Sequence, residues 1–281
     1  MIIQLLEKVR RASISFSKTR RLHQDLTKRQ KLIVATSAQS LVYLLVALIN
    51  QSSFWPTFVI SLCIVAGFTL WTLWEELADV KYGMLLVLPI FLFGSLVYFV
   101  RMTSTNSFLT FLSVFLYGFG AYSLLLTQNI YNVAAIRTIQ LVRAANAVGF
   151  LFTLVCAFFI FSVIWGARLH PWALAILVGS FSLPLTLQSL WSVDLEERVS
   201  KRLFGFSLLL SLVAAEIAFT FAFWPILPTI GALAIVVTLY VLLGLSQFYI
   251  SQRLLGRTVW EYVGVAVVIM TLILVTTKWG V

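Results

Sequence analysis

One ionisable side chain stands deep inside an apolar stretch of this 281-residue chain. Glu216 lies about thirteen residues into the run Leu203–Phe223, which carries no other charged residue. A charge at the centre of a bilayer costs about 3 kcal/mol even on mild insertion scales, so such groups face a cavity or a partner. We therefore expect a proton relay or cation site. The alternative is a protonated glutamic acid that hydrogen-bonds a neighbour and fixes helix packing.

Amide side chains recur with helical spacing between Asn129 and Asn146. At 100° per residue, one stripe of a helix carries Asn132, Gln140, Arg143 and Asn146. An arginine among amides suits the binding of a phosphate or carboxylate headgroup. The alternative is a cytoplasmic connector helix whose polar side is simply exposed to water.

Other chemistry-bearing residues are sparse. Cys63 and Cys156 both fall in apolar runs, with no spacing for a disulfide framework or a zinc site, and His23 and His170 are too few for a histidine cluster. The pair Glu196–Glu197 has no histidine after it to complete an intramembrane protease site. We therefore expect no metal, no cofactor and no catalytic constellation.

The composition indicates the elements that must position these residues. The chain is 61% hydrophobic and only 11% charged, with a mean hydropathy of +1.00. A soluble domain is about half apolar and a quarter charged, so a soluble enzyme is excluded. Stretches of about 20 apolar residues predict an all-α, polytopic transmembrane bundle of about nine spans. These spans are Leu32–Ile49, Phe54–Trp74, Met84–Val100, Phe108–Leu126, Ala147–Trp165, Trp172–Trp191, Leu203–Phe223, Thr229–Ile250 and Tyr262–Thr277.

The basic residues orient this bundle. With nine spans and a cytoplasmic N-terminus, only Arg101, Arg168 and Lys278 fall outside, and the other seventeen of the 20 basic residues fall inside. This asymmetry follows the positive-inside rule and predicts that the C-terminus lies outside. The net charge of +10 is then a property of the cytoplasmic face, so no nucleic-acid partner is expected.

The predicted domain organisation has five parts. Residues 1–31 form a basic arm in which Ile2, Leu5, Leu6 and Val9 share one helical face, typical of a helix lying on anionic lipid. The alternative is an arm that docks a cytoplasmic partner or RNA. The other parts are a first transmembrane half (32–126), a cytoplasmic connector helix (127–146), a second half (147–250) and a final span (251–281).

Two similar segments indicate an internal duplication. The second span ends in Phe-Thr-Leu-Trp-Thr-Leu-Trp (68–74), and the sixth ends in Leu-Thr-Leu-Gln-Ser-Leu-Trp (185–191). An even number of spans separates them, so spans one to four and five to eight would form a parallel 4+4 repeat followed by one helix. The alternative is chance similarity between apolar segments.

The chain resembles uncharacterised bacterial multi-pass membrane proteins in the segments Asn132–Gly149 and Trp191–Arg202. The likeness extends over spans two to nine. It implies a bacterial cytoplasmic membrane and no particular activity. From the residues themselves, we expect a carrier or lipid- and amphiphile-handling protein whose partners are membrane lipids. The alternative is a structural or assembly subunit of an envelope complex, with other membrane subunits as partners.

Overall fold

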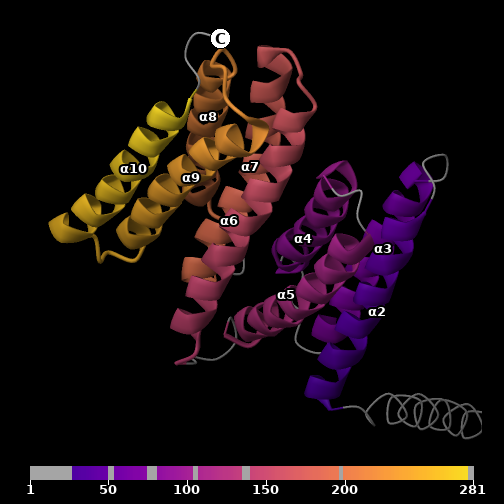
Figure 1. Cartoon of the computed structure of the whole chain (residues 1–281). Helices are drawn as coiled ribbons and strands as arrows, with labels where there is room; N and C mark the ends of the chain where they lie inside the picture. Colours follow the sequence, from indigo (N-terminus) through magenta and orange to yellow (C-terminus); the bar gives the residue numbers. More distant parts are fainter. Residues whose placement is uncertain are drawn as a thin grey trace, which may run out of the picture.

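The computed structural model describes residues 27–49, 54–74, 81–103, 107–134, 140–195 and 199–277. Within these ranges the chain forms nine helices, each long and apolar enough to cross a membrane, and no strand (Figure 1). This confirms the predicted all-α bundle of nine spans. The helices are α2 (Lys28–Leu48), α3 (Phe54–Leu73), α4 (Lys81–Thr103), α5 (Ser107–Ala134), α6 (Val142–Gly166), α7 (Pro171–Asp194), α8 (Lys201–Phe221), α9 (Pro228–Ile250) and α10 (Gly256–Thr276).

Local sequence signals set several helix starts. Thr27 and Gln30 form a capping box at α2, because the Thr27 N–H donates to Gln30 Oε1 at 2.8 Å and the Gln30 N–H donates to Thr27 Oγ1 at 3.4 Å. Pro171 and Pro228 occupy the first positions of α7 and α9, where proline costs no hydrogen bond. The basic arm lies outside the described residues except for its last five positions, which belong to α2 and its cap.

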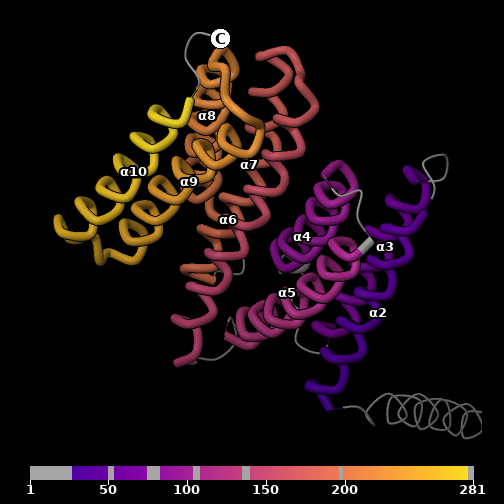
Figure 2. Tube along the Cα trace, viewed as in Figure 1, coloured from indigo at the N-terminus to yellow at the C-terminus, as the bar shows by residue number. Residues whose placement is uncertain are grey.

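The helices form two groups that meet along α4, α5 and α6. In the first group α2 packs against α3 and α5, α3 against α4, and α4 against α5. In the second, α6 packs against α7 and α9, α7 against α8, and α8 against α9. Figures 1 and 2 show the first group in indigo to magenta and the second in rose to orange, with α10 beside α9 at the periphery.

Buried polar side chains connect the helices of the first group. Gln39 on α2 donates from Nε2 to Thr69 Oγ1 on α3 at 3.2 Å, and its Oε1 accepts from the Tyr117 hydroxyl on α5 at 3.4 Å. The Tyr43 hydroxyl donates to Ser113 Oγ at 3.2 Å, and the rings of Tyr43 and Tyr117 stack at 4.9 Å. Hydrogen bonds of this kind link neighbouring helices where lipid offers no polar partner.

The segment predicted as a connector helix is divided between two spans. The fourth span does not end at Leu126, because α5 continues to Ala134, and residues 142–146 already belong to α6. Residues 135–139 lie outside the described residues. Asn132 remains in α5 because its Nδ2 donates at 3.0 Å to the carbonyl of Leu73, the last residue of α3. That bond gives a partner to the amide nitrogen and to a carbonyl left open at a helix end.

The two similar segments have matching burial but different partners. Three pairs of positions at a constant offset in sequence are buried in both segments. They are Val65 and Ser182, Thr69 and Thr186, and Leu73 and Leu190. Thr69, however, bonds Gln39 on α2, whereas Thr186 Oγ1 lies 3.2 Å from Ser211 Oγ on α8. The order of neighbours within each helix group is compatible with a parallel repeat, which stays a prediction.

Candidate functional site

Helices α7 and α8 form the most extensive helix pair among the described residues. Small residues allow this approach, since a Cβ on Gly179 would stand 3.2 Å from Ala215 Cβ. Toward the start of α8, Thr186 Oγ1 lies 3.3 Å from the Ser207 carbonyl and 3.2 Å from Ser211 Oγ. The two helices are therefore held together by both close packing and buried hydroxyl groups.

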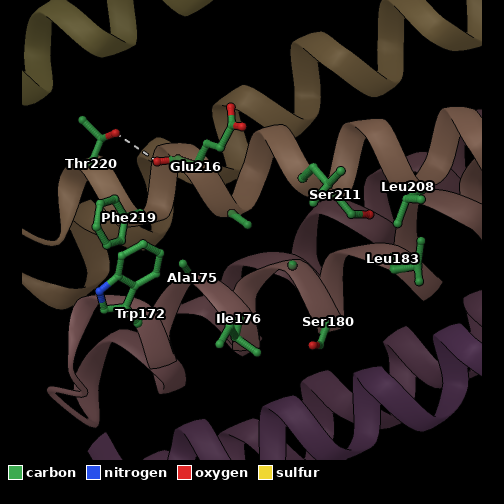
Figure 3. Close-up of a pocket in the computed structure, with 13 residues that line it drawn as sticks. Trp172, Ala175, Ile176, Ser180, Leu183, Leu208, Ser211, Glu216, Phe219 and Thr220 are labelled. Carbon is green, nitrogen blue, oxygen red and sulfur yellow. Dashed lines mark hydrogen bonds between the residues drawn. The ribbon is translucent and has the colours of Figure 1, made fainter.

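An open groove of about 610 Å³ follows this helix pair on the outside of the bundle. Most of its wall is apolar, and its polar atoms come from a few serine, threonine and glutamate side chains. The groove is lined by Trp172, Ala175, Ile176, Gly179, Ser180 and Leu183 on α7 and by Leu208, Ser211, Leu212, Ala215, Glu216, Phe219 and Thr220 on α8 (Figure 3). At one end the rings of Trp172 and Phe219 lie 4.5 Å apart.

Glu216 lies at the rim of this groove, on the surface of the molecule. Its side chain is exposed, and Figure 3 shows its carboxylate on the side of α8 that turns away from α7. Its backbone carbonyl accepts from Thr220 Oγ1 at 2.9 Å, but no described residue donates to its carboxylate. With a rise of 1.5 Å per residue, Glu216 is about 8 Å from the end of α8 at Phe221. Within a membrane it would face lipid, about halfway between the middle of α8 and the end that lies near Trp172.

The predicted amide stripe is not one surface. Asn132 is buried against α3, as described above, whereas Gln140 and Arg143 are exposed. Asn146 is partly buried, and its amide faces the Ser192 carbonyl on α7 at 3.1 Å, where the amide nitrogen donates once the group is turned to face this acceptor. Two stripe members therefore connect helix ends, and the other two face outward. Headgroup binding by Arg143 stays a prediction.

Helix ends near Asn132 carry polar side chains that the sequence analysis did not single out. The Tyr131 hydroxyl on α5 donates to the Ala145 carbonyl on α6 at 2.8 Å. Gln247 on α9 donates from Nε2 to Ser189 Oγ at 2.9 Å. Tyr131, Ser189 and Gln247 lie outside the amide stripe and carry no charge, so neither signal in the sequence marks them.

A second, more polar cavity of about 510 Å³ lies near the ends of α7 and α9 and the start of α8. Asp194, Ser200, Arg202 and Gln252 contribute its polar atoms. The Arg202 guanidinium lies 5.8 Å from the ring centres of both Phe206 and Tyr249, within the range of a cation–π contact. Among the residues that the structure describes, no three histidine, cysteine or acidic side chains lie close enough together to hold a metal ion.

Comparison with known proteins identifies a family and assigns the chain no activity. A family model described as "Protein of unknown function (DUF5656)" matches residues 47–276, which covers every helix from α3 to α10. No curated protein matches the chain, and no solved structure matches it.

Proposed function

Since the chain belongs to this family of unknown function, we propose an activity from the geometry, namely that it binds a membrane amphiphile in the α7–α8 groove. We propose further that it acts there as a carrier or lipid-handling protein. The observation that carries the proposal is an apolar groove, open to the lipid, with the unpartnered carboxylate of Glu216 at its rim. An acyl chain fits the apolar wall formed by residues such as Ile176, Leu208 and Leu212.

The carboxylate of Glu216 selects the chemistry of the headgroup. An exposed glutamate in a lipid-facing surface is unfavourable unless a partner donates hydrogen bonds or a positive charge to it. An amine-bearing headgroup supplies both, and Trp172 places an aromatic ring where interfacial indoles favour headgroups. We therefore propose an amphiphile with an amine head.

The location and partners belong to the same proposal. We place the protein in a bacterial cytoplasmic membrane, with membrane lipids as its partners and anionic lipid under the basic arm. The exposed apolar surfaces of the described helices support a lipid environment. No nucleic-acid partner is proposed.

Native mass spectrometry of the full chain, released from nanodiscs of mixed composition, tests this function. We expect the native protein to retain an amine-bearing phospholipid in preference to an anionic one. Glu216→Gln keeps the shape but removes the charge, and losing a charge-assisted hydrogen bond should weaken retention about tenfold. Ile176→Trp should lower retention of both lipids by filling the groove.

Leu41→Trp provides the matched control, because Leu41 on α2 is exposed to a similar degree as Ile176 but lies outside the groove. This variant should retain lipid as the native chain does. Equal lipid retention by the native chain and all three variants would contradict the proposal.

The exposed surface of α10 favours a second candidate, an assembly subunit of a membrane complex. This helix packs on α9, and only 6% of its 18-residue apolar stretch is buried. A partner helix on this face would be seen as a retained protein chain in the same mass spectra, with no dependence on Glu216.

A further inference from the structure

Two glutamines in the interior of the bundle have no hydrogen-bond partner. Gln128 on α5 is 0% exposed and Gln188 on α7 is 1% exposed, yet Nε2 and Oε1 of both side chains are unbonded. A buried amide without a partner costs about 1–3 kcal/mol, and lipid supplies no alternative. Four unbonded amide atoms therefore need an explanation.

The two glutamines lie at the same level. The Tyr131 hydroxyl on α5 bonds the Ala145 carbonyl on α6, and the next residue, Asn146, faces the Ser192 carbonyl on α7. The ends of α5 and α7 therefore both lie against the start of α6, so these two helices run in parallel. Gln128 precedes Tyr131 by three residues, and Gln188 precedes Ser192 by four, which places each glutamine about one turn deeper on the contacting face. Both are six residues from the end of their helix, or about 9 Å into the bundle.

Helices α4 and α6 each pack against both α5 and α7. Phe91 on α4 lies 5.8 Å from the ring of Phe181, two turns before Gln188 on the same face. Helix α4 also carries the buried Leu85 and Leu88. Oδ1 of Asn132, one turn from Gln128 toward the helix end, is also unbonded.

We propose that Gln128 and Gln188 flank a buried binding site for small uncharged hydrogen-bonding molecules, with water as the first occupant, open toward the ends of α5 and α7. Each amide offers both donors and an acceptor, the combination that bridging water requires. Both amides are neutral, which suits an uncharged ligand, and among the described residues the only buried charged side chain is Lys31, on α2. The site lies inside the bundle, whereas the α7–α8 groove opens on its outer surface, so neither proposal depends on the other.

Cysteine accessibility in the full-length protein in membranes tests this site. Gln128→Cys and Gln188→Cys are made in a background with Cys63→Ser and Cys156→Ala. Each is exposed to methyl methanethiosulfonate, a small neutral reagent. A cysteine thiolate, which forms where water reaches the sulfur, attacks its sulfenyl sulfur to give a methyl disulfide and release methanesulfinate. The probe is followed as a mass increase of the intact chain.

Two control positions give the slow and fast limits of the reaction rate. Leu185→Cys is equally buried on α7, one turn deeper, and should be inert, whereas Gln140→Cys is exposed near the same end and should react quickly. We expect both glutamine positions to react at least about tenfold faster than Leu185→Cys, since a buried thiol in apolar surroundings stays protonated. Rates equal to that of Leu185→Cys would overturn the proposal, because the two amides would then be dry or bonded to each other.

A measurement on the unsubstituted chain keeps the test valid if a cysteine variant does not fold. Backbone hydrogen exchange at residues 125–132 and 185–192 should be faster than at residues 232–239 of α9, a stretch that is similarly buried. Equal protection of all three segments would count against a hydrated site.

Discussion

The Tyr131 hydroxyl occupies the space that a side chain on Gly149 would need. A Cβ on Gly149 would overlap this hydroxyl, which donates to the Ala145 carbonyl on α6. Gly149→Ala should therefore lower the free energy of unfolding by about 1–3 kcal/mol through overpacking and loss of the bond to the Ala145 carbonyl. Chemical denaturation of the purified protein measures this change.

Two further variants make the Gly149 experiment specific. In a Tyr131→Phe background the hydroxyl is gone, so Gly149→Ala should cost less than in the native chain. Gly67→Ala on α3 is the control, because nothing lies within 4 Å of its added Cβ, and alanine favours a helix by up to about 1 kcal/mol. An unchanged penalty in the Tyr131→Phe background would show that the overlap is unimportant.

Individual residues differ in how far sequence alone could place them. Glu216 could be found because it is the sole charge in its span. Its exposure follows from the packing of α8 through small residues such as Ser211 and Ala214, which lie on the opposite, buried face. Asn132 was placed on a helix correctly, yet its burial depends on the end of α3. Contacts between helices distant in sequence decided both outcomes.

At the scale of elements, α10 is attached to the bundle through a notch in α9. The ring of Tyr262 fills the space over Gly244, stacks on Tyr240 at 4.7 Å and meets Phe248 edge-on at 6.1 Å. Gly244→Val should displace this ring and release α10 from α9. Trypsin should then cut faster at Arg253, which lies in the exposed turn before α10.

Gly264→Val is the matched control for that element, because it adds the same atoms on α10 where a Cβ meets nothing within 4 Å. Cleavage at Arg253 should stay at the native rate in this control. Equal acceleration in both variants would mean that the notch does not hold α10.

The existence of the nine spans could be predicted, whereas some boundaries could not. Hydropathy and length suffice for existence, since lipid requires each crossing segment to satisfy its own backbone. The end of α5 was missed because Asn129 and Asn132 look like the end of an apolar run. A polar residue can extend a span when another helix offers it a partner, which hydropathy along one segment does not reveal.

At the scale of the whole molecule, the orientation across the membrane is the remaining prediction, and it rests on charge. With nine spans, seventeen of the 20 basic residues fall on one side, and Lys278 is the one basic residue whose side depends on whether α10 crosses. Alkaline phosphatase fused after Val281 should therefore be active and green fluorescent protein fused there dark, because phosphatase folds outside and the fluorescent protein inside. A chain cut after Arg253, which follows α9, should give the reverse pattern. Because these two fusion sites differ by one helix, the same reporter pattern at both would show that α10 does not cross. A reversed pattern at both would show that the basic face lies outside.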